Sequence, residues 1–201
     1  MASFQKMPFL SIKMKQLDFY KAGEYYHIYN RAVGSERLFY SPENYRFFLA
    51  KSGIYLNESF DFLCYCLMPN HFHFLVRAKD TGNHDHQLRR FFISYSMALN
   101  KYRNRMGSLF MKPYKKKHVE SEDYLTRLIF YIHLNPVHHR FTKSFESYKW
   151  SSYHSIIGKE KNTLDLKIDH VVNWFGGLKG FRSVHRINKD LYSKDDNMWD
   201  N

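Results

Sequence analysis

The sequence predicts an α+β protein built on an antiparallel sheet, and three observations lead to that prediction. Segments rich in aromatic and β-branched residues alternate with segments in which apolar residues recur every three or four positions. Their order is β-α-β-β-α-β, which is the ferredoxin-like split β-α-β arrangement with helices on one face of the sheet. A third helix and a C-terminal helical extension follow, without repeats or a low-complexity linker.

The first half of the chain contains three expected strands and one helix. Residues 25–33 (YYHIYNRAV) have the composition of a strand, and a Gly-Ser pair ends them. A Ser-Pro pair opens a helix over residues 41–56, as its cap and its first helical residue. Residues 60–78 form two apolar strands with a break at Pro69, because proline cannot donate a hydrogen bond to a strand ladder.

The second half continues with two helices around a cation-rich strand. Residues 85–107 carry cations around one apolar stripe, and Gly107 can end this helix. The stripe consists of Leu88, Phe91, Phe92, Tyr95, Leu99 and Tyr102. Residues 109–120 are expected to form an edge strand. Ser121 caps the third helix, which we expect to end near Asn135 because the residue before a proline avoids helical backbone.

The pattern changes after residue 145, where short apolar clusters replace the longer elements. Residues 168–177 predict a short helix that ends at two glycines, and a basic helical stretch follows near residues 180–192. We therefore expect a core domain over residues 1–145 and a helical extension over residues 146–201.

The charge of the chain favours a polyanionic partner. There are 31 Lys and Arg residues against 19 Asp and Glu, so the net charge is +12 and the pI about 9.6. Aromatic residues make up 18% of the chain, and rings interleaved with cations suit stacking on unpaired bases as well as core packing. Nucleic acid is therefore the leading partner, and an ordinary basic surface is the alternative.

The cysteines and the hydropathy bear on the compartment. Cys64 and Cys66 are the only cysteines, and a strand would point both to one side, which is a poor arrangement for a disulfide. The first residues lack a continuous apolar stretch, and nowhere do 18 apolar residues run together. We expect a cytoplasmic protein that does not associate with a membrane.

The pattern His-x-His occurs twice, and only one copy lies in a strand. With 12 histidines in the chain, chance alone supplies on the order of one such pattern. His84 and His86 lie in a polar loop that runs into the start of a helix, where solvated histidines are expected. His71 and His73 would point to one face of a strand roughly 7 Å apart, so two imidazoles can converge on one ion. The alternative is a pair of hydrogen-bonded histidines on a half-exposed sheet face.

The third helix supplies a second group of candidate residues. Tyr131 and Asn135 are one helical turn apart and therefore share a face. An amide oxygen with two imidazoles is a mixed nitrogen and oxygen set that suits Mn²⁺ or Mg²⁺ with open positions. The Tyr131 phenol could then approach a phosphate bound at that ion.

Two stretches together resemble a known family. MPNHFHFLV, followed downstream by YLTRLIFYIHLNPV, is similar to the HUH-type single-tyrosine transposases, in particular to the REP-associated group. The resemblance covers about residues 20 to 158, including YKWSSYHSIIG. It implies that residues 1–145 are the catalytic domain, that His71, His73 and Asn135 hold Mg²⁺ or Mn²⁺, and that Tyr131 attacks DNA.

The resemblance implies a metal-dependent endonuclease and strand transferase for single-stranded DNA, cutting at hairpins through a 5′-phosphotyrosine link. The cations expected to contact DNA are Arg89, Arg90, Lys112, Lys115, Lys116 and Lys117, with Lys101, Arg103 and Arg105 as further candidates. Family members often have a Gln-Gly-Arg-like stretch where SLFMKPYKKK follows Gly107 here, and this departure bears on DNA-sequence preference.

Two other functions remain open from the sequence. The fold is also used to stack RNA on its sheet, so a non-catalytic nucleic-acid-binding protein is the first alternative. A structural metal protein without a nucleic-acid partner is the second. Monomer and homodimer are both compatible with the residues.

Overall fold

The computed structural model describes residues 19–80, 83–160 and 164–187. All the expected strands lie in these ranges, and so does most of each expected helix. The end of the basic stretch predicted over residues 180–192 lies outside the described residues.

Four strands form one antiparallel sheet in the order β2-β3-β1-β4. They are β1 (Tyr25–Arg31), β2 (Phe60–Met68), β3 (His71–Ala78) and β4 (Lys115–Val119). This order confirms the predicted ferredoxin-like arrangement, with β1 paired to both β3 and β4. The edge strand β4 is shorter than the expected residues 109–120. Just before it, the chain pairs beside the end of β1 through the isolated bridge between Phe110 and Ala32, and Pro113, which cannot donate to a ladder, separates this bridge from β4.

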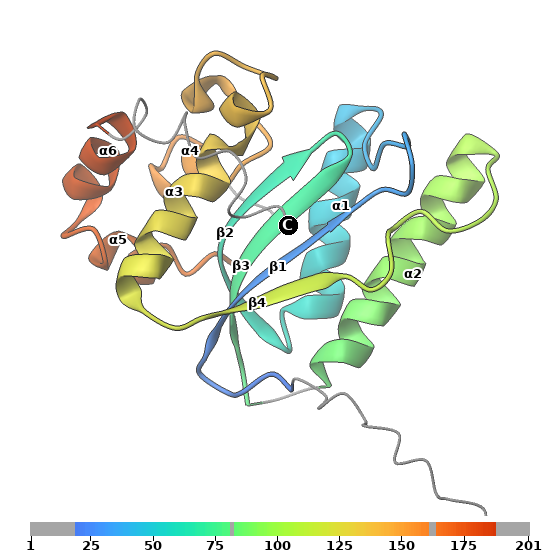
Figure 1. Cartoon of the computed structure of the whole chain (residues 1–201), viewed down its shortest axis with the longest axis horizontal. Helices are drawn as coiled ribbons and strands as arrows, with labels where there is room; N and C mark the ends of the chain where they lie inside the picture. The colour runs from blue at the N-terminus through green and yellow to red at the C-terminus, as the bar shows by residue number, and fades with distance from the viewer. Residues whose placement is uncertain (1–18, 81–82, 161–163, 188–201) are drawn as a thin grey trace, which may run out of the picture.

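Two helices, α1 (Pro42–Leu56) and α2 (His84–Arg103), lie side by side on one face of the sheet (Figure 1). Strand alternation turns Phe72 and Phe74 of β3 toward them, and the rings of Phe48 and Phe72 lie 5.1 Å apart. The histidines of β3 therefore point to the opposite face. Tyr102, expected on the apolar stripe of α2, is instead 66% exposed, and it borders a hollow beside the start of α1.

The third helix, α3 (Glu122–His138), packs on the histidine face of the sheet, mainly against β2. It does not end near Asn135 as expected, since Pro136 lies inside it. The physical reason is that a proline close to a helix end removes only one hydrogen bond, and the Pro136 carbonyl still accepts from the Phe141 nitrogen at 2.9 Å. Asn135 therefore stays in helical register with Tyr131.

The C-terminal segment covers the outer side of α3 and the edge strand β2 (Figure 1). Isolated bridges join Cys66 to Ser151 and Phe62 to Leu166, so this segment continues the sheet edge. Its elements are η1 (Phe145–Ser147), α4 (Tyr153–Ile156), α5 (Ile168–Asn173) and α6 (Leu178–Ile187). A domain boundary near residue 145 stays a prediction.

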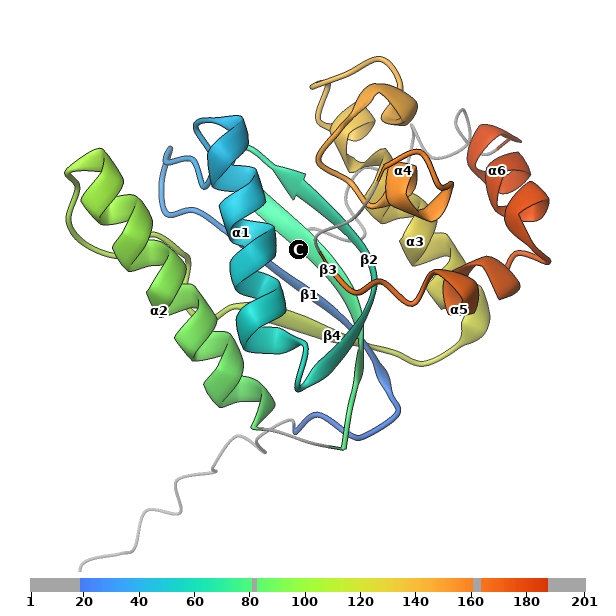
Figure 2. The same ribbon diagram turned by 180° about the vertical axis from the view of Figure 1, so that it is seen from behind.

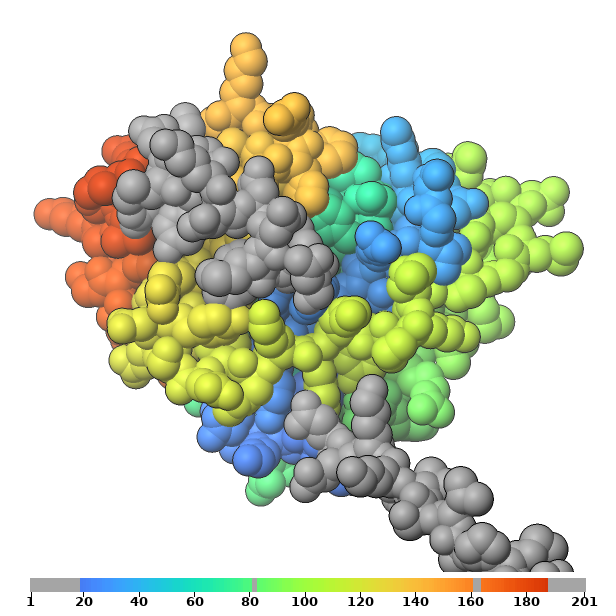
Figure 3. All heavy atoms as spheres, in the orientation of Figure 1, coloured from blue at the N-terminus to red at the C-terminus, as the bar shows by residue number. Residues whose placement is uncertain are grey.

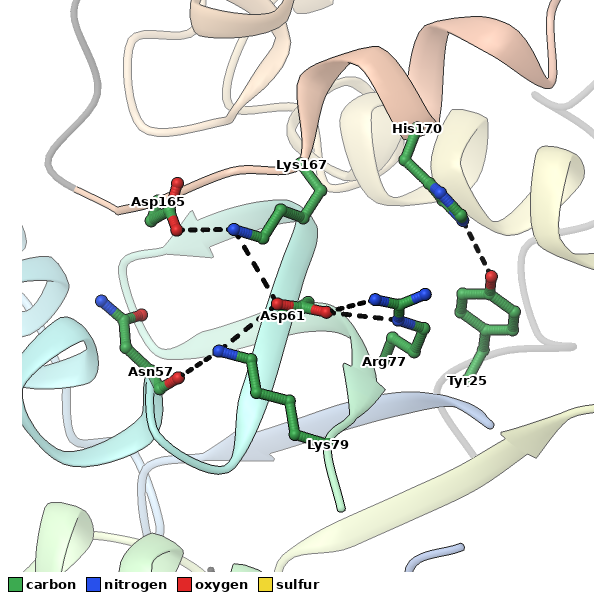
Figure 4. Close-up of polar contacts among 8 residues, drawn as sticks. All are labelled: Tyr25, Asn57, Asp61, Arg77, Lys79, Asp165, Lys167 and His170. Carbon is green, nitrogen blue, oxygen red and sulfur yellow. Dashed lines mark hydrogen bonds and ion pairs between the residues drawn. The ribbon is translucent and has the colours of Figure 1, made fainter. Parts of the chain in front are cut away.

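A charged cluster centred on Asp61 of β2 ties this segment to the sheet (Figure 4). Arg77 donates to the Asp61 carboxylate from Nε at 3.2 Å and from Nη2 at 2.6 Å. The ammonium groups of Lys79 and Lys167 lie 3.4 and 3.9 Å from the same carboxylate. Burial raises the pKa of Asp61, but the neighbouring cations outweigh it and hold this pKa below its usual value. The backbone N–H of Lys167 also donates to the Phe62 carbonyl at 2.9 Å, directly before α5.

A directional chain of hydrogen bonds joins α3 to α6 through two buried histidines. Nδ1 of His185 donates to the Phe181 carbonyl at 2.8 Å, so its Nε2 accepts from Nδ1 of His133 at 2.9 Å. Nε2 of His133 then accepts from the Ser152 hydroxyl at 2.8 Å. This chain is complete with both imidazoles neutral, and a proton added to Nε2 of His185 would set it against the proton on Nδ1 of His133.

Acid is therefore expected to destabilise the packing of α6 on α3. Burial lowers the pKa of His185 to about 4, and burial with the nearby His185 and His154 holds the pKa of His133 well below its usual value. The unfolded chain takes up these protons below about pH 6.5, whereas the folded chain does not. The free energy of unfolding should thus be unaffected above that pH and fall as the pH drops toward 4, by up to about 1.4 kcal/mol per pH unit and per histidine.

Urea denaturation at about pH 7.5 and about pH 5 measures this loss. His185→Gln removes one titrating group and keeps an acceptor for His133, so its loss between the two pH values should be smaller than that of the parent chain. Equal unfolding free energies for the parent chain at both pH values would contradict the prediction.

Candidate metal and nucleic-acid site

The structure brings together the four residues predicted for the metal and the nucleophile. The C-terminal half of α3 lies over the end of β3 where His71 begins the strand. Nε2 of His71 lies 2.9 Å from Oδ1 of Asn135. The rings of His73 and Tyr131 meet edge to face with centroids 5.9 Å apart. One sheet face and one helix thus carry all four side chains into a single site.

His71 is held between two side-chain amides. Its Nδ1 lies 2.8 Å from Oδ1 of Asn70, and its Nε2 faces Oδ1 of Asn135. A neutral imidazole has one proton, so it can donate to only one of these oxygens. If Nδ1 donates to Asn70, the lone pair of Nε2 faces the lone pairs of Oδ1 of Asn135. Two acceptors at this distance need a positive group between them, which is either a second proton on the imidazole or a cation.

His27 of β1, which no sequence motif singled out, supports His73. Nε2 of His27 and Nδ1 of His73 are 2.9 Å apart and both rings are buried. A metal-bound histidine commonly donates its other ring proton to a neighbouring acceptor, which fixes its tautomer and orientation. His73 would therefore bind a cation through Nε2 while its Nδ1 donates to His27. The only sequence signal was that His27 lies in a predicted strand, and strand pairing was needed to set it beside His73.

Removing the His27 imidazole should weaken cation binding without unfolding the chain. We expect His27→Ala to lower the affinity for Mn²⁺ by about 10- to 100-fold, as for other residues that orient metal ligands. His27→Gln keeps an acceptor near Nδ1 of His73 and should recover part of the loss. Calorimetric titration with Mn²⁺ measures the affinity, and equal affinities for the parent and His27→Ala would contradict the role.

The donor set fits a cation that keeps open positions. Two cis ligands of an octahedral ion with bonds of about 2.1 Å lie roughly 3.0 Å apart, close to the 2.9 Å between His71 and Asn135. Nδ2 of Asn135 is buried and has no hydrogen-bond partner among the described residues. In the described ranges, no three His, Cys, Asp or Glu side chains gather as a metal site. A cation here would rest on two imidazoles and one amide, with water or phosphate oxygens completing its shell.

A cavity of about 630 Å³ opens beside the two strand histidines. Arg31, Lys112 and Lys115 give its lining a positive charge, while Met111 and Phe141 supply apolar surface. Such a mixture can hold a phosphate next to a base. The cavity residues are Tyr29, Asn30, Arg31, Asn70, His71, Phe72, His73, Met111, Lys112, Pro113, Lys115, His139 and Phe141.

The lysines of β4 divide between the two faces of the sheet. Lys115 and Lys117 pair with Tyr29 and His27 of β1 and share the face of the site. Lys116 points to the other face, where its ammonium lies 4.1 Å from the centroid of the Tyr20 ring. Figure 3 shows β4 and the segment before it as a yellow-green band across the molecular surface.

The structure does not bring Arg89 and Arg90 to this site. Both are exposed on α2, which covers the face of the sheet opposite to His71 and His73. Figure 2 shows this layer from outside. The second His-x-His pattern, His84 and His86, lies in the first turn of α2 and is also remote from the site. The cations predicted to bind DNA therefore fall into two separate groups.

Comparisons with known proteins agree with the fold. No protein-family model matches the chain, and no curated protein matches it by sequence. Among solved structures, the chain is similar to one described as a REP-associated tyrosine transposase bound to a REP hairpin, with a TM-score of 0.59. The match covers 84% of this chain and 96% of that chain at 12% sequence identity.

In the part of the chain that the structure describes, no helix has the length and hydrophobicity needed to cross a bilayer.

Proposed function

We propose that the chain is a metal-dependent endonuclease and strand transferase for single-stranded DNA, with Tyr131 as its nucleophile. The observation that carries the proposal is that Tyr131 and Asn135 meet two strand histidines beside a cavity rimmed by cations. The contacts of the Tyr131 phenol and the Asn135 amide with the histidines depend on the packing of α3 on the histidine face of the sheet.

In the proposed reaction the Tyr131 oxygen attacks a backbone phosphate and loses its proton. A bond forms between the tyrosine oxygen and phosphorus while the bond from phosphorus to the 3′ oxygen breaks. The fragment with the 5′-phosphate is then linked to the tyrosine, and the other fragment leaves with a 3′ oxygen that takes up a proton to become a free 3′-OH. Because one phosphoester replaces another, that 3′-OH can reverse the step with the same strand or with a new one. A divalent cation held by His71, His73 and Asn135 would stabilise the charge that develops on the phosphate oxygens.

The substrate we propose is a DNA strand folded into a hairpin. The similar solved structure is described as bound to a REP hairpin, and this chain has the charge to bind DNA as well. Arg31, Lys112 and Lys115 would contact phosphates next to the cut.

A second candidate function is DNA binding without cleavage. The observation that favours it is the burial of Tyr131, which is only 4% exposed. Attack on a phosphate in the cavity requires the phenol to turn outward or the residues over it to move. A chain that cannot make this movement would bind hairpins and leave them intact.

The test uses labelled single-stranded hairpins from the flanks of the protein's own gene, with Mg²⁺ or Mn²⁺. The proposed activity yields a protein-DNA adduct that survives denaturing electrophoresis, together with a 3′ end that a polymerase can extend. Hairpin binding without adducts would favour the second candidate.

A further inference from the structure

A second charged surface lies on the layer formed by α1 and α2, on the far side of the sheet from the candidate site (Figure 2). Residues 36–56 and 84–107, which make up this layer, contain eight Lys and Arg against three Asp and Glu. Two of the acids are already paired within the layer, Glu43 with Arg46 at 2.8 Å and Glu36 with Arg105 at 3.7 Å. The remaining charge is strongly positive.

Three aromatic rings on this layer, those of Phe47, Tyr55 and Tyr40, each lie next to a cation. The Lys51 ammonium lies 5.3 Å from the Phe47 ring centroid and 5.6 Å from that of Tyr55. The Arg90 guanidinium lies 5.5 Å from the same Tyr55 ring. At the C-terminal end of α2, the Arg103 guanidinium lies 4.3 Å from the centroid of the Tyr40 ring. We name this surface the α1–α2 outer groove; it comprises Tyr40, Phe47, Lys51, Tyr55, Arg90, Tyr102 and Arg103.

Three of the four aromatic side chains are exposed, whereas Tyr55 is half-buried. Tyr40, Phe47 and Tyr102 are 36%, 39% and 66% exposed. Phe47 and Tyr102 also line a hollow of about 340 Å³ between the helices. Phe47 and Tyr55 are eight residues apart on one helix, about 12 Å, which is room for about two stacked nucleotides.

We propose that the α1–α2 outer groove binds an unpaired stretch of nucleic acid, separately from the candidate site. Exposed rings can stack only on bases that are not already paired, and the cations beside them can contact the phosphates of the same nucleotides. A second copy of the chain fits this groove poorly, because two equal positive surfaces would repel each other. A duplex would use the cations but not the rings.

The experiment measures binding of a fluorescent oligothymidylate to the full chain carrying Tyr131→Phe, so that cleavage plays no part. The groove variant Lys51→Glu/Arg90→Glu/Arg103→Glu is compared with Lys143→Glu/Lys149→Glu/Lys179→Glu, which changes the net charge equally at exposed positions elsewhere. We expect at least tenfold weaker binding for the groove variant. The slope of log K against log salt concentration should also become shallower by about two, since each of the three lost phosphate contacts to a single strand contributes about 0.7 to that slope. Phe47→Ala/Tyr102→Ala should weaken oligothymidylate binding and leave duplex binding unchanged.

Each other result overturns the proposal. Equal losses for the two charge variants would mean that only the total charge matters. A groove variant that keeps oligothymidylate binding but loses binding to vesicles containing anionic lipid would assign the groove to a membrane surface. A parent chain that sediments as a dimer, with a monomeric groove variant of unchanged oligothymidylate affinity, would assign it to a second copy.

Discussion

Tyr131→Phe is expected to abolish covalent protein-DNA adducts while hairpin binding stays nearly unchanged. The substitution removes one oxygen, which is the only atom that can form the phosphotyrosine bond in the proposed reaction. The ring that packs against His73 with centroids 5.9 Å apart is kept, so the fold and the cavity should be preserved. Denaturing electrophoresis of the reaction with labelled hairpin measures the adduct, and a mobility-shift titration measures binding.

The matched control is Tyr124→Phe, which lies two turns earlier on the same helix. Tyr124 is half-buried, and we interpret it as a packing residue. This variant should form adducts at a rate close to that of the parent chain. If Tyr131→Phe forms adducts as well as the parent does, another residue is the nucleophile and the proposed mechanism is wrong.

The second large effect is expected from the two strand histidines. His71→Ala or His73→Ala removes one of the three donors, so Mn²⁺ affinity should fall by more than about 100-fold and adducts should disappear at low Mn²⁺. Asn135→Ala should cost less affinity, because a neutral amide oxygen is a weaker donor than an imidazole. The Mn²⁺ electron paramagnetic resonance signal reports binding independently of DNA cleavage.

His86→Ala is the control for the histidine variants. It removes an exposed imidazole of the other His-x-His pattern, on the opposite side of the sheet, and should leave Mn²⁺ binding unchanged. Retention of Mn²⁺ binding and of adducts in His71→Ala would exclude this histidine as a ligand. Retention of adducts after complete removal of divalent cations by a chelator would exclude metal dependence itself.

Much of the fold could be predicted because it depends on local patterns. The order of strands and helices follows from hydrophobic periodicity, and the turn at Pro69 and the cap at Ser121 follow from single residues with narrow conformational preferences. The facing of His71 and His73 to one side needs only the two-residue period of a strand. The shared face of Tyr131 and Asn135 likewise needs only the helical period, although the helix passes through Pro136 rather than ending before it.

What the sequence by itself determined was therefore each pair of functional side chains, because members of a pair are close along the chain. Only the tertiary structure decided that the two pairs meet, that His27 from a third segment supports one of them, and that Arg89 and Arg90 lie on the other side of the sheet. Contacts between distant segments depend on which faces the sheet and α3 bury against each other. That choice results from the packing of the whole core, which no local pattern contains.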